Sequence, residues 1–206
     1  MHANLVTLVR IIFTFVVVGL LGKNFYLDIA MFFLILIIIM MDWLDGLIAR
    51  KYEETSEFGA LFDIAGDRIV ENIFWIYFAV SGLISVWVPM IVISRGFLTD
   101  LLRTMAFAKG KTPFGKKTMM ESSWARAIVS SHTTRGIYAA LKVIAFCYLA
   151  GLIVLEDAPA KFSIPSSNIL YTVAQILVYI VVAMCIIRGI PVIWDGRKYL
   201  VESMEW

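Results

Sequence analysis

Six long apolar segments limit what this chain can fold into. A transmembrane helix needs about 20 mostly apolar residues. Segments of roughly this kind run approximately over Thr7–Leu21, Leu27–Ile48, Gly59–Ser81, Val86–Ala108, Thr134–Leu155 and Asn168–Trp194. Lipid offers no hydrogen-bond partners to the backbone, so each crossing segment has to satisfy its own peptide groups as a helix. The sequence therefore predicts an all-α membrane protein with six transmembrane helices.

The overall composition agrees with a membrane fold. Of the 206 residues, 61% are hydrophobic and 17% are charged, which is too apolar for a water-soluble domain of this size. No repeat or second domain is visible, so we expect residues 1–206 to form a single membrane domain. The N-terminal apolar run lacks a signal-peptide cleavage site and is expected to remain as the first span. Cys147 and Cys185 lie in apolar stretches, which predicts buried hydrophobes rather than a disulfide or a metal pair.

The distribution of basic residues predicts the orientation in the membrane. With both termini cytoplasmic, the inner side collects Arg10, Arg50, Lys51, Arg103, Lys109, Lys111, Lys116, Lys117, Arg126, Arg135, Arg197 and Lys198. The outer loops then keep only Lys23 and Lys161. Because cytoplasmic loops are enriched in Lys and Arg, both termini are expected to be cytoplasmic. The polar segment Lys109–Thr133 is then a cytoplasmic loop, partly helical around Trp124–Val129.

Four aspartates lie at the predicted cytoplasmic ends of the second and third helices: Asp42, Asp45, Asp63 and Asp67. An ionised acid beside hydrocarbon is unfavourable unless something pairs it, and four neighbouring acids cannot all stay ionised without cations. Residues three, four, seven and eight apart share one face of a helix. That spacing puts Asp42, Asp45, Gly46, Ala49 and Arg50 on one stripe, and Gly59, Asp63 and Asp67 on another. A short connection would bring both stripes together as an antiparallel hairpin.

Converging carboxylates of this kind indicate a site for hard divalent cations. Oxygen ligands suit Mg²⁺ or Mn²⁺ better than Zn²⁺. Two such ions can clamp the attacking and leaving oxygens in phosphoryl transfer, and magnesium is often shared with substrate phosphates. The pattern thus favours a phosphorylated substrate. In the alternative interpretation, the acids cap helix ends or pair with Arg50, Lys51 and Arg68 at the interface.

The spacing of these residues is also a recognisable motif. From Asp42 to Asp67 the chain reads D-x2-D-G-x2-A-R-x8-G-x3-D-x3-D. This pattern resembles the signature of the CDP-alcohol phosphatidyltransferase family at every fixed position. The resemblance implies homodimers of six-helix protomers, each with two bound Mg²⁺ or Mn²⁺ ions. It also implies an activity: the displacement of CMP from CDP-diacylglycerol by the hydroxyl of a second alcohol, which thereby receives the phosphatidyl group.

The resemblance also implies residue roles. Asp42, Asp45 and Asp63 match the metal ligands, and Asp67 is close enough to join them. Asp67 matches the acid that takes the proton from the attacking hydroxyl. The positions that hold the CDP moiety correspond to Asp45, Gly46, Ala49, Arg50, Ser56 and Gly59. Ser56 stands where relatives often carry Thr, and it keeps the hydroxyl.

Several cations could neutralise a phosphate on the acceptor alcohol: Arg103, Arg135, Lys142 and Arg188. The stretch I-S-R-G-F-L-T-D-L-L-R resembles the I-S-R-E-F pattern of phosphatidylglycerophosphate synthases, whose acceptor is glycerol 3-phosphate. Gly96 departs from that pattern, which has Glu there, and Gly115–Thr118 only partly matches the G-K-x-K-T element of that subfamily. Arg95, Asp100 and Arg103 could instead form an ion-pair network, with Asp100 and Arg103 as the natural partners. For Arg95 this network is the alternative to contact with the substrate.

Other acceptors and another class of protein stay open at this stage. Inositol phosphate and phosphatidylglycerol are alternative acceptors, although Met105 stands where the inositol-phosphate branch is expected to carry a second basic residue. An ion-coupled transporter also uses intramembrane acids, but it predicts charges near the bilayer midplane and related repeats. The expected partners are membrane lipids and the two substrates, with no nucleic acid. We expect an integral protein of a prokaryotic plasma membrane, with its active site on the cytoplasmic side.

Overall fold

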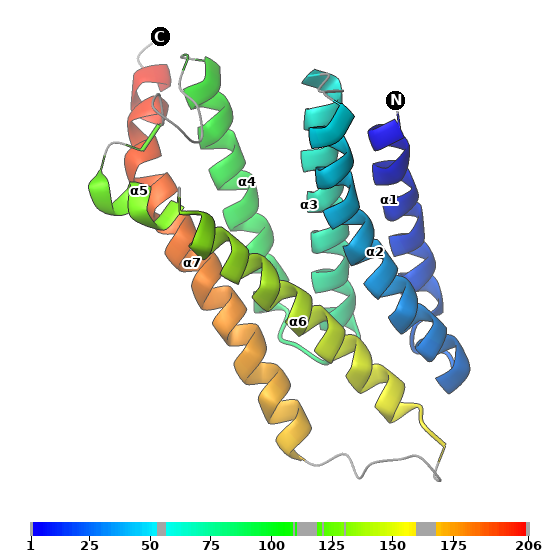
Figure 1. Cartoon of the computed structure of the whole chain (residues 1–206). Coiled ribbons are helices and arrows are strands. Elements are labelled where there is room, and N and C mark those ends of the chain that lie inside the picture. Colours follow the sequence, from blue (N-terminus) through cyan, green and yellow to red (C-terminus); the bar gives the residue numbers. More distant parts are fainter. Residues whose placement is uncertain are drawn as a thin grey trace. The chain divides into compact units, whose positions relative to one another are not determined.

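The computed structural model is all helical over the residues that it describes, which are 2–52, 57–108, 110, 119–120, 122–129, 131–159 and 168–204. For 2–3, 42–52, 57–58, 60, 132 and 200–204 only the helical backbone is described. The helices are α1 (His2–Leu20), α2 (Phe25–Tyr52), α3 (Glu57–Val80), α4 (Trp87–Ala108), α5 (Ser123–Val129), α6 (His132–Glu156) and α7 (Asn168–Met204) (Figure 1). Six of them coincide with the predicted apolar segments, and α5 is the short helix expected in the polar loop.

Hydrophobicity located these helices but not their ends. The second and sixth segments were predicted to stop at Ile48 and Trp194, whereas α2 continues to Tyr52 and α7 to Met204. In α7 the extension is amphipathic, with Tyr199 buried and Arg197 exposed, so packing continues after the apolar run has ended. The edge of an apolar run indicates where hydrocarbon ends, and a helix can continue past that point.

Within the described part of the chain, two helices are long and apolar enough to cross a membrane. They are α6, over Thr133–Glu156, and α7, over Asn168–Tyr199. Shorter apolar stretches lie in α1 and α2. The six-span topology with cytoplasmic termini therefore stays a prediction.

The chain divides into two compact units. Unit 1 comprises Met1–Val86 and Val143–Gln175, and unit 2 comprises Trp87–Lys142 and Ile176–Trp206. Helices α6 and α7 each contribute one part to each unit. The single membrane domain stays a prediction.

Aromatic side chains form the centre of unit 1. Phe74, Trp75 and Phe78 of α3 are at most 1% exposed. Their rings lie 5.5, 4.8 and 5.9 Å, respectively, from the ring of Phe146 on α6. Edge-on and tilted aromatic pairs of this kind add to the gain from burial alone. They hold α3 against the second half of α6.

The turn between α1 and α2 is held by a buried carboxylate. Asp28 is fully buried, and its Oδ1 accepts the backbone N–H of Gly22 at 2.6 Å. Gly22 has a φ of 81°, a left-handed conformation that glycine adopts without strain. The hydroxyl of Tyr77 on α3 donates to the Leu21 carbonyl at 2.7 Å, which ties the same turn to α3.

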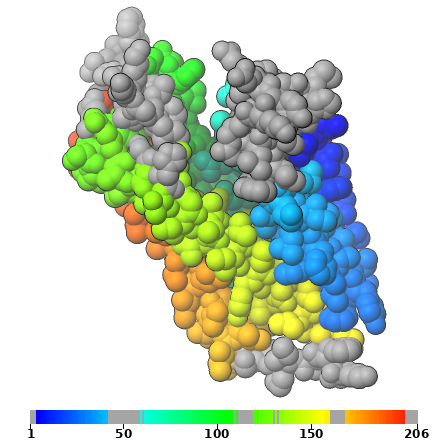
Figure 2. Space-filling model, viewed as in Figure 1, coloured from blue at the N-terminus to red at the C-terminus, as the bar shows by residue number. Residues whose placement is uncertain are grey.

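An apolar cavity of about 440 Å³ lies in unit 1 between α2, α6 and the start of α7. Phe32 and Phe33 line one side, and Cys147 and Gly151 line another. Figure 2 shows α2 in blue against the second half of α6 in yellow, the elements that form most of its walls. Both cysteines are free; Cys185 is buried as expected, and Cys147 is partly buried.

In unit 2 the short helix α5 is anchored to α7 by a carboxylate. Asp195 of α7 accepts the backbone N–H of Ser122 at 3.1 Å and its hydroxyl at 2.8 Å. Ser122 immediately precedes α5, and its carbonyl accepts the N–H of Arg126 at 3.1 Å. The buried neighbours of this junction form a cluster of Leu102, Ala106, Met119, Met120, Ala125, Val129, Val192 and Tyr199.

Helices α1 and α3 approach closely at one glycine. A Cβ atom on Gly66 would lie 2.3 Å from Cγ2 of Thr7, far inside van der Waals contact. Thr7 is 2% exposed and its branched side chain has little freedom to move. The absence of a side chain at position 66 therefore sets the distance between the two helices.

We expect Gly66→Ala to destabilise the protein by about 1–3 kcal/mol, because the added methyl group overpacks a close contact. Thermal unfolding in detergent would report the change. Gly19→Ala is the matched control, since a Cβ there meets nothing within 4 Å. Thr7→Ser combined with Gly66→Ala should recover part of the loss, and an unchanged melting temperature for the single variant would contradict the packing argument.

Candidate active site

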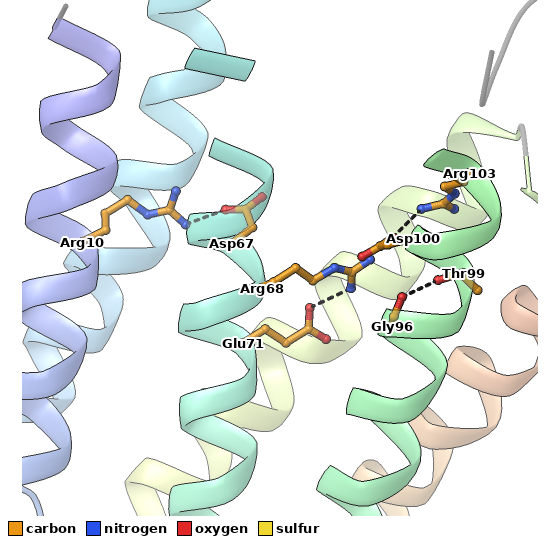
Figure 3. Close-up of polar contacts among 8 residues, drawn as sticks. All are labelled: Arg10, Asp67, Arg68, Glu71, Gly96, Thr99, Asp100 and Arg103. Atoms are coloured by element: carbon orange, nitrogen blue, oxygen red, sulfur yellow. Dashed lines mark hydrogen bonds and ion pairs between the residues drawn. The ribbon is translucent and has the colours of Figure 1, made fainter. Parts of the chain in front are cut away.

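Two of the four predicted aspartates, Asp63 and Asp67, lie on the same face of α3 and meet Arg10 of α1. Nη2 of Arg10 is 3.0 Å from Oδ1 of Asp67, and Nη1 is 3.9 Å from Oδ1 of Asp63 (Figure 3 shows the shorter contact). The Arg10 side chain is only 5% exposed, whereas those of the two acids are 51% and 50% exposed. A buried cation thus faces two carboxylates that remain accessible from outside the helix pair.

Arg10 reaches the acids because α1 presents one buried polar face to its neighbours. Thr7, Arg10 and Thr14 follow one another at helical spacing and are each at most 4% exposed. The hydroxyl of Thr14 donates to the Arg10 carbonyl at 2.8 Å. The close approach at Gly66, next to Asp67, brings this face of α1 within hydrogen-bond distance of the carboxylate.

A third acid extends the stripe on α3 by one turn. Glu71 follows Asp63 and Asp67 at steps of four residues and is 9% exposed. Its Oε2 lies 3.9 Å from Nη1 of Arg68, three residues earlier on the same helix (Figure 3). Arg68, considered from the sequence as a partner of the aspartates, is thus in contact with Glu71.

The remaining residues of the motif are less fully described. Asp42, Asp45, Gly46, Ala49 and Arg50 belong to the last part of α2, but their side chains lie outside the described residues, and Ser56 lies outside them altogether. Gly59 is partly buried near the start of α3. The convergence of four acids on one pocket therefore stays a prediction. Among the described residues, no group of three or more His, Cys, Asp or Glu side chains is arranged to hold a metal ion.

The described donors nevertheless fit the expected type of metal. Asp63 and Asp67 offer carboxylate oxygens on one helix face, and each is about half exposed. Oxygen donors of this kind suit Mg²⁺ and Mn²⁺, which usually complete their coordination with water or substrate phosphate. The two acids could therefore supply part of the predicted ligand set.

Unit 2 contains a cluster of cations around a tyrosine. Arg135, Tyr138 and Lys142 follow one face of α6, and Arg188 comes from α7. Nζ of Lys142 lies 4.8 Å from the centre of the Tyr138 ring, and Cζ of Arg188 lies 5.9 Å from it. Nη1 of Arg188 also donates to the Thr134 hydroxyl at 2.8 Å. Three of the four cations proposed from the sequence for an acceptor phosphate are thus on elements that pack together within one unit.

Arg95 of α4 adds a further positive charge to this cluster. It is close enough to Arg188 to repel it electrostatically, as is Arg135. The Arg95 side chain packs over Gly189, where a Cβ would lie 2.8 Å from its Cγ. Within the described residues, neither Arg95 nor Arg188 forms an ion pair with an acid, and the buried Nε of Arg95 has no acceptor. Cations gathered in this way are stabilised by a bound anion, and guanidinium groups match phosphate oxygens well.

Arg103, the fourth predicted phosphate ligand, has a partner on its own helix. Its Nη1 lies 3.4 Å from Oδ1 of Asp100, one turn earlier on α4 (Figure 3). The ion pair that the sequence offered as an alternative is therefore present. A role for Arg103 in phosphate binding stays a prediction.

Two of these residues, Arg10 and Arg95, were not identified as site residues from the sequence. Arg10 was used only as a topology marker, and for Arg95 an ion-pair network on its own helix stood beside contact with the substrate as an open alternative. An arginine within an apolar helix is unfavourable without a specific partner, so position alone could have marked Arg10 as a candidate. The partners themselves depend on which helices pack together, which no local pattern reveals.

The structure is that of a helical, apolar protein. Carboxylates suited to divalent cations lie in one unit, and a cluster of cations lies in the other. A family model described as CDP-alcohol phosphatidyltransferase matches residues 1–187. The chain therefore belongs to the CDP-alcohol phosphatidyltransferase family, as the aspartate motif indicated. This family is membrane-embedded, generally depends on divalent metal ions, and uses CDP-diacylglycerol and an alcohol acceptor.

Two curated relatives carry the same printed name, CDP-diacylglycerol–glycerol-3-phosphate 3-phosphatidyltransferase. The protein of Mycoplasma genitalium is 30% identical over 92 residues, which are 45% of this chain and 36% of the relative. The protein of Bacillus subtilis is 28% identical over 90 residues, which are 44% of this chain and 47% of the relative. The chain thus matches less than half the length of either relative.

Proposed function

We propose that this chain transfers the phosphatidyl group of CDP-diacylglycerol to the hydroxyl of glycerol 3-phosphate and releases CMP. The observation that carries the proposal is the complete aspartate motif, of which Asp63 and Asp67 share one face of α3. The family match and the names of the two relatives support the reaction and the acceptor. The cation cluster in unit 2 supports a phosphorylated acceptor.

Asp42, Asp45, Asp63 and Asp67 would hold two Mg²⁺ or Mn²⁺ ions per protomer. When bound, the ions would neutralise the diphosphate of the CDP-lipid and make the acceptor hydroxyl more acidic. Asp45, Gly46, Ala49, Arg50, Ser56 and Gly59 would hold the CDP moiety. Glycine and alanine at these positions leave room for a ligand to approach the backbone of both helices.

The proposed reaction is a direct displacement. The acceptor oxygen forms a new bond to the β-phosphorus, which carries the diacylglycerol, and the bond from this phosphorus to the bridging oxygen breaks. CMP leaves with the bridging oxygen. Asp67 accepts the proton of the attacking hydroxyl, a step that needs the two groups to be held in line. The sequence offers no evident Ser–His or Cys–His nucleophile, which favours this route over a covalent intermediate.

We propose that Arg135, Lys142 and Arg188 bind the phosphate of the acceptor, with Arg103 as a fourth ligand. Arg95 joins this set because it lies near Arg188 in the structure. Arg188 is 7% exposed, so its charge is costly without an anionic partner. Its contact with Thr134 fixes one end of the guanidinium and thereby orients the rest of the group. An uncharged acceptor would offer Arg188 no such partner.

We also propose a membrane location, an orientation and an oligomeric state for the protein. The six apolar helices would span a prokaryotic plasma membrane with both termini in the cytoplasm, and the acids would face the cytosol. Residues 1–206 would form one membrane domain, and two copies would associate as a homodimer. The family resemblance supports the dimer, and the distribution of basic residues supports the orientation.

The purified protein should release CMP from CDP-diacylglycerol when glycerol 3-phosphate and Mg²⁺ or Mn²⁺ are present. We expect Asp67→Asn to lower kcat by about 10²–10⁴-fold, the usual contribution of a positioned proton acceptor. Glu156→Gln is the matched control, because it removes an exposed carboxylate of unit 1 outside the motif. A wild-type protein that releases no CMP, or an Asp67→Asn variant with full activity, would refute the proposal.

The acceptor assignment is tested by Arg188→Gln. We expect this variant to raise the KM for glycerol 3-phosphate by about 10–150-fold, the loss of a hydrogen bond to a charged group. The KM for CDP-diacylglycerol should change little. Arg188→Lys keeps the charge and should lie between the variant and the wild type, while Arg197→Gln removes an exposed arginine of α7 as a control.

A panel of acceptors completes this test. Glycerol 3-phosphate, inositol phosphate, serine and phosphatidylglycerol would be compared at equal concentrations. Turnover with serine alone, or a KM for glycerol 3-phosphate that Arg188→Gln leaves unchanged, would overturn the role given to the cation cluster. Turnover with inositol phosphate in place of glycerol 3-phosphate would keep that role and change the alcohol.

A further inference from the structure

We propose that Arg10 is a positioning residue for the reaction, which it serves by fixing the orientation of the Asp67 carboxylate. The inference rests on the proposed function, because Asp67 is the acid assigned there to the attacking hydroxyl. Arg10 stands outside the aspartate motif and comes from a different helix, α1. It contacts Asp67 at 3.0 Å and approaches Asp63 to 3.9 Å.

Arg10 is buried whereas Asp67 is half exposed, and this difference allows Arg10 to hold the carboxylate in place. A half-exposed aspartate on a helix surface is free to change rotamer unless a neighbour holds it. Arg10 is 4% exposed and is surrounded by the packed face of α1 and α3, so its own side chain is restricted. The planar guanidinium donates along fixed directions, and its contact with Oδ1 therefore restricts rotation of the whole Asp67 carboxylate.

The local packing supports the same geometry. Thr7 meets α3 at Gly66, the residue that precedes Asp67, and Thr14 bonds to the Arg10 carbonyl. Arg10 lies between these two threonines on the buried face of α1. The distance from the α1 backbone to Asp67 is therefore set by a rigid contact one turn away, as positioning within a fraction of an ångström demands.

The positive charge of Arg10 makes it possible to distinguish a positioning role from a role in metal binding. A guanidinium 3–4 Å from two carboxylates repels any divalent cation that the same carboxylates bind. Removal of Arg10 should therefore leave metal affinity unchanged or increase it. If the variant loses activity but still binds the metal, the change lies in the orientation of the Asp67 carboxylate.

The experiment compares wild type, Arg10→Met and Arg10→Lys, with Lys23→Met as a control that removes an exposed cation of the same unit. We expect Arg10→Met to lower kcat by about 10²-fold, the scale of an ångström-sized misplacement, with the KM for CDP-diacylglycerol within about threefold of wild type. Arg10→Lys, which restores one donor, should recover at least about tenfold of the loss. Lys23→Met should match wild type.

A second readout does not depend on turnover. Bound Mn²⁺ raises the melting temperature of a protein that binds it only when folded. We expect Arg10→Met to retain the full Mn²⁺-dependent rise measured for wild type. Equal kcat values for wild type and Arg10→Met would overturn the inference. So would a variant that loses the Mn²⁺-dependent rise together with activity, because Arg10 would then maintain the site as a whole.

The proposed function and the positioning role of Arg10 are refuted by different results. If wild type releases no CMP from CDP-diacylglycerol with any acceptor, the proposed function fails and the role of Arg10 fails with it. If wild type is active, Asp67→Asn is inactive and Arg10→Met is fully active, only the positioning role is wrong.

Discussion

The structure of unit 1 depends on how a buried arginine is compensated. Arg10 is nearly inaccessible, and a guanidinium in such surroundings is stable only with anionic partners. Asp63 and Asp67 provide them from α3, and the glycine at position 66 lets α1 approach closely enough for the contact. The same arrangement leaves both carboxylates half exposed. One interaction therefore stabilises the packing of α1 on α3 and presents acidic oxygens to a ligand.

Much of the fold follows from the sequence, because apolar runs of transmembrane length leave few alternatives to helices. Helix ends were less predictable: α7 continues past Trp194 because Tyr199 still packs into unit 2. The aspartate motif located Asp63 and Asp67 correctly on one face of α3, since helical periodicity alone determines that placement. Their contact with Arg10 could not be predicted in this way, because it requires knowing that α1 lies beside α3.

The cation cluster of unit 2 was also only partly predictable from the sequence. Arg135 and Lys142 share a face of α6 by their spacing, and this was evident from the sequence. The approach of Arg188 to Tyr138 and Thr134 depends on the packing of α7 against α6 within unit 2. For Arg95 the sequence left two roles open, membership of an ion-pair network on its own helix and contact with the substrate. Asp100 pairs with Arg103, as the spacing indicated, and Arg95 packs over Gly189.

Gly96 stands where the subfamily pattern carries glutamate, so α4 has one acid fewer at this point. Gly96 is buried, and its carbonyl accepts the hydroxyl of Thr99 at 3.0 Å (Figure 3). A glutamate here, as in the I-S-R-E-F pattern, would add a carboxylate to the buried side of α4. With glycine, α4 brings the charge of Arg95 towards Arg188 without an acid beside it. The subfamily that carries glutamate here also uses a phosphorylated alcohol, so the case for an anionic acceptor rests on the buried Arg188 and its neighbour Arg95 rather than on Gly96.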